Sequence, residues 1–321
     1  MSTPPFPKNI TIETTASCQL RCPACPTPVS LGRPRGFFSE SLFQQLMEQV
    51  SWPLEAVSFG WSGEPLLNRS LPRMIAMAGV IGAVTYVSTN GLLLERDGDA
   101  LLDSGLSVLR ICLDGVDQGM AEKYRIGTDF DKVIQGTKRL VERRAARQLR
   151  TPSISLQMLV TRDTEAYLSD FLALAEACGV DEVYFKSFNL SLSDWLPSSH
   201  RQEMARTYLP VLPSSHRFLR YTLDRSGEYA LLPEILAAPC PEIESGVTIL
   251  HTGDVVPCCE DFRGSHRLGN IQQQSLEEIW RGAPYHALRM KVRGRALSMC
   301  EECSYPGSGG YNQVVPLRPV P

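Results

Sequence analysis

Three cysteines near the N-terminus have the spacing of an iron–sulfur ligand set. Cys18, Cys22 and Cys25 form a CxxxCxxC loop that directly follows a strand-like run, Ile10–Thr14. A cubane cluster is held by cysteine thiolates on its irons. If three thiolates take three of the four irons, the remaining iron stays open to a reactant. The spacing therefore predicts both a cluster and an open coordination position on it.

The alternative for this loop is a structural zinc site. Zinc is usually enclosed by four ligands in tetrahedral geometry, often from paired CxxC knuckles. This loop offers three cysteines with no histidine or fourth cysteine nearby, and Pro23, Pro26 and Pro28 stiffen it by fixing φ. The pattern favours iron–sulfur chemistry over zinc.

A second group of cysteines lies toward the C-terminus: Cys240, Cys258, Cys259, Cys300 and Cys303. Ten cysteines in a chain without a secretory signal are more typical of metal or redox chemistry than of disulfides. Four of this group, without Cys259, could enclose either an iron–sulfur cluster or a zinc ion held by four thiolates.

Composition excludes several other classes of protein. The 321 residues are 43% hydrophobic with a net charge of −3, which disfavours nucleic-acid binding by a basic surface. Arg143, Arg144 and Arg147 are more typical of a solvated helix face. No apolar run is long enough to span a membrane, and the N-terminus lacks the pattern of a signal peptide. We expect a cytoplasmic protein with neither nucleic acid nor membrane as a partner.

The elements that must position the first cysteines alternate between strand and helix over about residues 8–190. Six strands are expected, at Ile10–Thr14, Ala56–Phe59, Val84–Ser88, Val108–Leu113, Ile154–Val160 and Glu182–Lys186. Helices are expected from near Ser39, over about Phe130–Arg147, and over about Thr164–Cys178 with Gly179 as the stop. This alternation predicts parallel βαβ units, and ligands then gather at the C-terminal ends of the strands.

The expected fold is α/β: a partial (β/α)6 barrel with a small C-terminal cysteine-rich metal-cluster domain. We place the barrel at 1–190, a proline- and serine-containing bridge with some helix at 191–237, and the cysteine-rich domain at 238–321. The last part has too little apolar sequence for a large core of its own, so we expect it to depend on metal.

Short motifs after the expected strands make the chain resemble the radical SAM enzymes. CxxxCxxC follows the first strand, Gly63-Glu64-Pro65 the second, Ser88-Thr89-Asn90-Gly91 the third and Cys112-Leu113-Asp114-Gly115 the fourth. In the fourth motif, Cys112 stands where the family usually has serine, which puts a hydroxyl contact there in doubt. The match covers roughly residues 8–190.

The resemblance implies a [4Fe–4S] cluster on Cys18, Cys22 and Cys25 that binds S-adenosylmethionine (SAM). It further implies the cofactor contacts: Gly63 and Glu64 for the methionyl amine, Ser88 and Asn90 near the ribose, Asp114 in the turn after the fourth strand, Arg125 for the carboxylate and Gln157 for the ribose. A reduced cluster of this kind cleaves SAM to a 5′-deoxyadenosyl radical, which abstracts hydrogen from an unactivated carbon. An external one-electron reductant, such as flavodoxin or ferredoxin, is then a required partner.

The C-terminal cysteines resemble the SPASM/twitch extension of radical SAM enzymes. A full SPASM domain implies seven cysteines and two clusters, whereas five cysteines here favour a single auxiliary [4Fe–4S] cluster on Cys240, Cys258, Cys300 and Cys303. Cys259 could replace Cys258 as a ligand, return a hydrogen atom to a substrate radical, or be a small buried residue beside the cluster.

The segment around Cys259 also contains a hairpin signal and three acidic residues. Thr252–Pro257 has Gly-Asp at the expected turn. We expect turn and cap roles for Asp254, Glu260 and Asp261 in preference to a role as base.

The leading functional hypothesis is a radical SAM oxidoreductase. It would abstract hydrogen from a small polar substrate, such as a sugar or aminocyclitol, and the auxiliary cluster would take the second electron in a dehydrogenation. The alternatives are a ribosomal peptide maturase, a radical epimerase with Cys259 as hydrogen donor, and a zinc-binding protein without catalysis. Against the maturase, few residues precede the first expected strand, where a leader-binding extension is expected.

Overall fold

A ten-stranded, mainly parallel sheet forms the centre of the computed structural model, which describes residues 6–29, 31–190, 197–301, 303–305 and 308–318. The strands follow the order β11-β10-β9-β1-β2-β3-β4-β5-β6-β12. The central six are β1 (Asn9–Ile12), β2 (Ala56–Phe59), β3 (Val84–Thr89), β4 (Val108–Cys112), β5 (Ser153–Val160) and β6 (Glu182–Ser187). All six pair in parallel in sequence order, which confirms the expected βα partial barrel.

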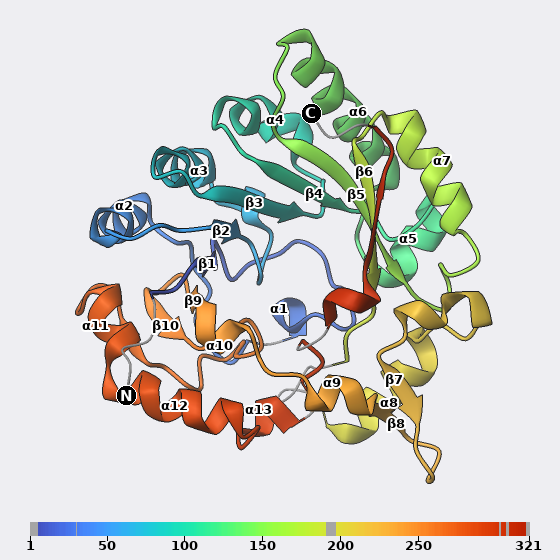
Figure 1. Cartoon of the computed structure of the whole chain (residues 1–321). Coiled ribbons are helices and arrows are strands. Elements are labelled where there is room, and N and C mark those ends of the chain that lie inside the picture. The colour runs from blue at the N-terminus through green and yellow to red at the C-terminus, as the bar shows by residue number, and fades with distance from the viewer. Residues whose placement is uncertain (1–5, 30, 191–196, 302, 306–307, 319–321) are drawn as a thin grey trace.

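Helices cover the outer side of this curved sheet (Figure 1). They are α2 (Glu40–Gln49), α3 (Leu71–Val80), α4 (Leu94–Asp103), α5 (Gln118–Tyr124), α6 (Phe130–Ala146) and α7 (Leu168–Cys178). Ser39 caps α2 by accepting a hydrogen bond from Leu42 N, and Gly179 ends α7 in the left-handed conformation, as the sequence predicts. The expected start of α7 near Thr164 is wrong, because Thr164 is used in a turn with Thr161.

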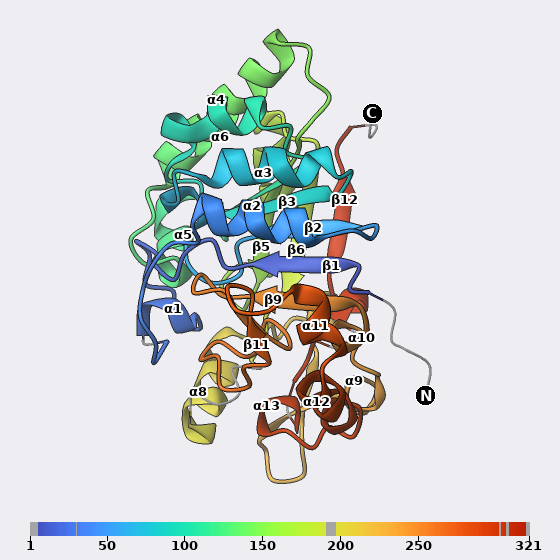
Figure 2. The same ribbon diagram turned by 90° about the vertical axis from the view of Figure 1, so that its left-hand side faces the viewer.

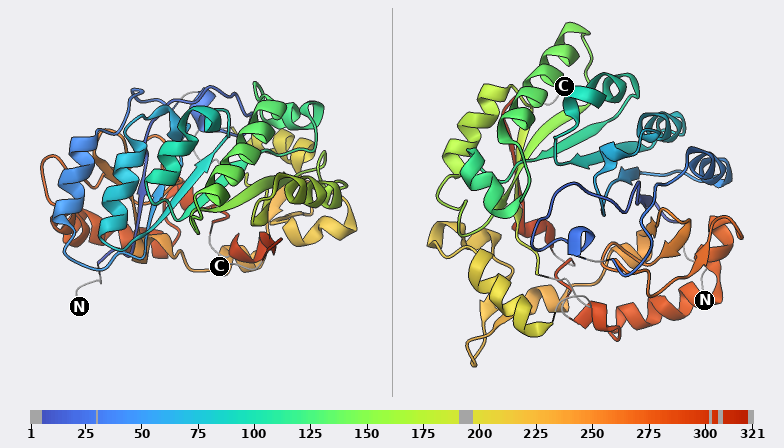
Figure 3. Two further views of the ribbon diagram at one scale, coloured as in Figure 1. Left: turned by 90° about the horizontal axis from the view of Figure 1, so that it is seen from above. Right: turned by 180° about the vertical axis from the view of Figure 1, so that it is seen from behind.

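The two faces of the parallel strands differ in polarity. Their outward residues, such as Val87, Leu109 and Leu156, belong to one apolar core shared with the helices. On the other face, Arg110 of β4 stacks over the ring of Tyr184 of β6 at 3.7 Å. The short helix α1 (Pro26–Val29) lies on this inner side (Figure 3). A polar inner face is typical of a barrel that holds a ligand rather than a packed interior.

The C-terminal region extends the same sheet at both edges. On one edge β9 (Gly246–Ile249) pairs in parallel with β1, followed by the antiparallel strands β10 (Asp254–Val256) and β11 (Gly269–Asn270). On the other edge β12 (Gln313–Pro316) pairs antiparallel with β6. Figure 2 shows β9 beside β1 and β12 on the far side. The β9–β10 turn at Gly253 confirms the predicted hairpin.

The bridge combines helix with a two-stranded hairpin. It contains α8 (Ser198–Tyr208), the 3-10 helix η2 (Pro213–Phe218), β7 (Tyr221–Leu223), β8 (Tyr229–Leu231) and α9 (Pro233–Ala237). The remaining short elements are η1 (Pro65–Leu67), α10 (Glu242–Ser245), α11 (Leu276–Arg281), α12 (Ala283–Arg293), α13 (Ser298–Glu301) and η3 (Ser308–Tyr311). The boundaries at 190 and 237 stay predictions.

The arginine cluster on α6 is neutralised within the fold. Arg143 and Arg147 pair with acidic residues of α4, including Asp99. Arg144 is buried and pairs with Asp181, so the prediction of a solvated face is wrong for this residue. Among the described helices, none has the length and apolar character needed to cross a bilayer.

Candidate functional site: a cysteine loop, an auxiliary cysteine set and two cavities

The cysteine loop lies at the C-terminal end of β1, and its thiols are close enough to influence one another. The charges of Cys18 and Cys25 both act on Cys22. Cys18 Sγ accepts hydrogen bonds from Leu20 N at 3.4 Å and from Asn90 Nδ2 at 3.8 Å. Burial raises the pKa of Cys18 to about 11 and that of Cys22 to about 12. The protein alone therefore favours the protonated thiols at neutral pH, and a bound metal would be needed to stabilise the thiolates.

Gly63 and Glu64 fold against this loop at the end of β2. Gly63 has φ +75°, and a Cβ on it would lie 2.2 Å from the carbonyl oxygen of Thr15, so the backbone approach requires glycine. The fully buried Glu64 carboxylate accepts hydrogen bonds from Thr89 Oγ1 at 2.7 Å and Asn90 N at 2.8 Å. Burial raises its pKa, and these donors oppose the rise.

The polar residues after β3 and β4 converge on the same end of the sheet. Asp114, at φ 58°, accepts from Leu159 N at 2.6 Å and forms an ion pair with Arg125 Nε at 2.6 Å. Burial lowers the pKa of Arg125, but the adjacent Asp114 outweighs it and the net pKa is raised. Ser88 Oγ lies 3.2 Å from Cys112 Sγ, so the cysteine in the serine position bonds to the neighbouring strand.

Gln157 lies on β5 directly opposite Cys112 of β4 in the parallel register. Its side chain is buried. The structure therefore brings all seven predicted cofactor residues to one end of the sheet, around the cysteine loop: Gly63, Glu64, Ser88, Asn90, Asp114, Arg125 and Gln157.

Three of the four predicted auxiliary ligands line one cavity of about 520 Å³, which we call the outer cavity. They are Cys240, Cys300 and Cys303. Arg295 Nη1 donates to the carbonyl oxygens of Cys300 at 2.9 Å and Cys303 at 3.3 Å, which fixes this pair. The charges of Cys258 and Cys303 act on each other, so Cys258 lies close to the set. Three thiols around a cavity of this size, with Cys258 close by, suit an iron–sulfur cluster.

Within the described ranges, no three cysteine, histidine or carboxylate side chains already stand at metal-ligand geometry.

A second cavity of about 590 Å³, which we call the inner cavity, is lined by residues near both cysteine groups in the sequence. Its lining comes from the loop after β2, from β6 and the segment that follows it, from the bridge, from the loop after β10 and from the C-terminal region: Trp61, Tyr184, Lys186, Asn189, Arg220, Pro241, Cys259, Glu260, Phe262, Tyr305 and Asn312. Cys259 thus lines a different cavity from Cys240, Cys300 and Cys303. Its thiol is buried, which raises its pKa.

Glu260 does not have the predicted turn or cap role. Its side chain lines the inner cavity, and its Oε2 is buried without a hydrogen bond in the described structure. Burial raises the pKa of Glu260 to about 7, and Arg220 and a hydrogen bond from the Asn189 side chain oppose the rise. The neighbouring Asp261 does make a turn, accepting from Ser265 N and His266 N at 2.8 Å each, and Asp254 accepts from Thr252 Oγ1 within its hairpin.

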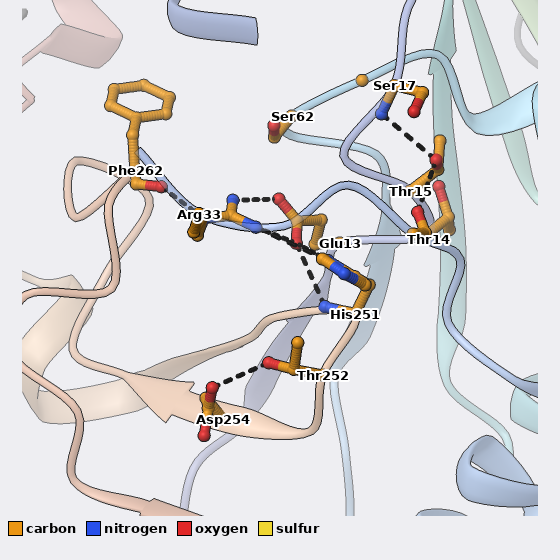
Figure 4. A network of polar contacts seen from close by, with 12 residues as sticks. Glu13, Thr14, Thr15, Ser17, Arg33, Ser62, His251, Thr252, Asp254 and Phe262 are labelled. Atoms are coloured by element: carbon orange, nitrogen blue, oxygen red, sulfur yellow. Dashed lines mark hydrogen bonds and ion pairs between the residues drawn. The ribbon is translucent and has the colours of Figure 1, made fainter. Parts of the chain in front are cut away.

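A buried ionic network joins the end of β1, the segment after α1 and the C-terminal region (Figure 4). Glu13 accepts from both terminal nitrogens of Arg33 and from His251 N at 3.1 Å and Nδ1 at 2.8 Å. Arg33 Nε donates to the carbonyl oxygen of Phe262 at 2.7 Å. Phe262 stacks on Trp61 with ring centroids 5.2 Å apart. The network therefore holds one wall of the inner cavity.

The sequence interpretation missed most of the inner cavity. Tyr184 and Lys186 alternate on β6, and a lysine in a parallel strand was a usable signal for an inward polar side chain. Arg220 and Trp61 carried no such signal, since they lie outside the regular strands.

Comparison with known proteins identifies the class to which this site belongs. Residues 12–175 match the radical SAM superfamily, and the chain belongs to that superfamily. Residues 240–304 match SPASM, an iron–sulfur cluster-binding domain. These matches imply a SAM-binding [4Fe–4S] cluster and auxiliary iron–sulfur binding, and the two cysteine groups fit them in ligand chemistry and position.

Relatives of known activity include both peptide-modifying and other enzymes. "PqqA peptide cyclase" of Xanthomonas campestris pv. campestris (strain 8004) is 25% identical over 94% of this chain and 81% of its own. A "tungsten-containing aldehyde ferredoxin oxidoreductase cofactor-modifying protein" of Pyrococcus furiosus is 24% identical over 92% of this chain and 87% of its own.

Solved structures share the fold. BtrN in complex with AdoMet and 2-DOIA matches with a TM-score of 0.57 and 19% identity over 94% of each chain. Streptococcus suis SuiB bound to the precursor peptide SuiA matches with a TM-score of 0.63 and 14% identity, over 93% of this chain and 71% of that one.

Proposed function

We propose that the protein is an oxidoreductase that removes hydrogen from a small polar group held in the inner cavity. The observation that supports this is the lining of that cavity. Trp61 lies two residues before Gly63 of the SAM loop, and Cys259 is adjacent to the auxiliary ligand Cys258. A group bound there is next to both cysteine sites.

The chain's own residues then bind, orient and shield. When bound, the cluster and SAM supply a 5′-deoxyadenosyl radical for hydrogen abstraction. Glu64 presents a buried carboxylate to the methionyl ammonium, and Gly63 lets the backbone approach. Arg125, fixed by Asp114, offers its guanidinium to the carboxylate. Ser88, Asn90 and Gln157 would contact the ribose side, and the Trp61–Phe262 stack excludes water from the cavity.

Cys240, Cys258, Cys300 and Cys303 would hold one auxiliary cluster, which would supply an electron acceptor for the substrate radical. Cys259, which lines the inner cavity, would then be left outside the ligand set. Loss of a second electron with a proton completes a dehydrogenation. A flavodoxin- or ferredoxin-type protein would supply the electron for SAM cleavage.

The first test is anaerobic reconstitution. We expect about eight irons per chain and 5′-deoxyadenosine on chemical reduction with SAM. Stoichiometric zinc with fewer than about four irons would contradict the assignment of both sites.

Cys259 makes epimerisation testable against dehydrogenation. In deuterium oxide, a thiol donor carries deuterium into an epimerised product, whereas dehydrogenation places none at the reacting carbon. Cys259→Ala should abolish epimerisation and spare dehydrogenation, with Cys178→Ala, a buried helix cysteine away from both sites, as control. If the Cys259→Ala variant still epimerised its substrate fully, Cys259 would not be the hydrogen donor.

A peptide maturase is the second candidate, because the PqqA peptide cyclases match this chain over 94% of its length. The inner cavity would then receive one side chain of the peptide. Mass spectrometry of candidate peptides, incubated with the reduced enzyme and SAM, separates the two: a loss of two hydrogens in a peptide supports this candidate.

A further inference from the structure

Three charged side chains reach the inner cavity from separate parts of the fold. Lys186 comes from β6, Arg220 from the turn before β7 and Glu260 from the loop after β10. Arg220 is 3% exposed and Glu260 8%. Their charges act on one another, yet none of the ion pairs among the described residues joins any two of them. Lys186 is half-buried, whereas Arg220 and Glu260 are buried, and buried charges without a paired charge are unfavourable unless a ligand satisfies them.

Two polar atoms of residues that line the cavity have no hydrogen-bond partner in the described structure. Oε2 of Glu260 and Nε1 of Trp61 are buried without a hydrogen bond in the part of the chain that is described. Arg220 donates from Nε to Ser187 Oγ at 2.7 Å and from Nη1 to Ser304 Oγ at 3.1 Å, so its guanidinium is held in one orientation. Acceptor and donors therefore line one cavity, and the guanidinium among them is fixed in place.

The charges around the inner cavity indicate that its ligand is negatively charged. Lys186 and Arg220 outnumber Glu260, and Arg110, stacked over Tyr184 of the same wall, adds a third cation nearby. A guanidinium fixed in one plane suits the planar carboxylate. A phosphate would bring nearly two negative charges close to Glu260, whereas a single carboxylate leaves Glu260 available to a hydrogen-bond donor.

We propose that the inner cavity selects a substrate group bearing a carboxylate, held by Lys186 and Arg220, next to a hydrogen-bond donor held by Glu260. This inference rests on the proposed function, since it takes this cavity as the place of the reacting group. It narrows the substrate class to a free hydroxy- or amino acid, or to an acidic side chain within a peptide.

Binding to the reconstituted holoenzyme with SAM, measured by anaerobic isothermal titration, tests the proposal. The probes are 2-hydroxyglutarate as a free acid, the N-acetyl amide of glutamic acid as an acidic side chain, and the N-acetyl amide of glutamine as its neutral match. We expect at least one acid to bind about tenfold or more tightly than the glutamine probe. Which acid binds separates the two sources of the carboxylate.

Variants test whether the preference for acidic probes arises in the inner cavity. Lys186→Met should remove the acid preference, whereas Lys132→Met, an exposed lysine on α6, should keep it. Glu260→Gln should weaken 2-hydroxyglutarate more than glutarate, because only the former presents the donor.

The proposal is overturned if the acid and glutamine probes bind equally, if neither acid saturates below about 50 mM, or if Lys186→Met keeps the preference. Iron content and 5′-deoxyadenosine formation are measured in every variant. Loss of these in the wild type contradicts the proposed function, while the binding preference tests the cavity independently.

Discussion

At the scale of single residues, the backbone geometry of the SAM site requires a glycine at position 63. Gly63 places its backbone against Thr15 at the end of β1, where a methyl group would clash with the carbonyl oxygen. Motif order alone predicted Gly63 beside the cofactor, but the reason for glycine is this contact. It involves residues 48 positions apart and is visible only once the strands are paired.

Gly63→Ala should therefore lower the free energy of unfolding by more than the strain of a left-handed alanine alone. Gly82 has a similar φ of +81° with open space around it, so Gly82→Ala isolates the left-handed cost, about 1 kcal/mol. Gly63→Ala should lose about 1–3 kcal/mol more from overpacking and should lower SAM cleavage. Chemical denaturation and 5′-deoxyadenosine yield measure both, and equal losses in the two variants would contradict the clash.

The outer and inner cavities also divide the cysteines at this scale. The sequence left Cys258 and Cys259 interchangeable, because neighbouring residues in a loop carry no periodic signal for direction. In the structure Cys259 lines the inner cavity, whereas Cys240, Cys300 and Cys303 line the outer one. Cys258 lines neither cavity, and the charge of Cys303 acts on both Cys258 and Cys259, so Cys258 as the fourth ligand stays a prediction.

At the scale of elements, Glu13 connects the end of β1 to the segment after α1, through Arg33, and to the turn of the β9–β10 hairpin, through His251. Burial opposes its charge, but hydrogen bonds from His251 and Arg33 outweigh it and lower its pKa to about 2. The ionised form is therefore stabilised by folding. This contribution is complete above pH 4.5, where the unfolded carboxyl is ionised, and is lost as the pH falls through about 2.

Glu13→Gln should destabilise the protein by about 3 kcal/mol at neutral pH, because it leaves the buried Arg33 without its carboxylate. Glu55→Gln, in an exposed pair with Lys8, should cost less than about 1 kcal/mol. Denaturant titration gives both values. The difference between wild type and Glu13→Gln should shrink from pH 4.5 toward 2, and a constant difference would mean that the charge of Glu13 is not responsible.

The parallel strands and the capped helices were predictable for a local reason. Short apolar runs and a cap such as Ser39 are written within a few neighbouring residues. The pairing of β9 with β1 and of β12 with β6 was not, because a partner more than a hundred residues away leaves no periodic trace in either segment. The same holds for Arg220 and Glu260, which are 40 positions apart in the sequence and line the same cavity.

At the scale of the whole molecule, the C-terminal region shares the sheet and the apolar core of the barrel. Because this packing is made by protein groups rather than by a metal, we expect the C-terminal region to stay folded without the auxiliary cluster. SAM cleavage at the first cysteine group should then continue when the auxiliary cluster is removed. Cys300→Ala/Cys303→Ala should lower the iron content from about eight to about four while 5′-deoxyadenosine still forms on reduction. Iron analysis and product quantification check this, with Cys178→Ala as control. Loss of all the iron would show that the two sites assemble together.

The covering of both sheet edges also sets an order for biosynthesis. When β6 leaves the ribosome, the six parallel strands are complete, yet β1 and β6 still expose unpaired backbone groups at either side. Their neighbours β9 and β12 arrive only with the last third of the chain. Until translation is nearly finished, the nascent barrel therefore exposes two strand edges that can pair with other chains. The C-terminal region covers both edges and so prevents edge-to-edge association.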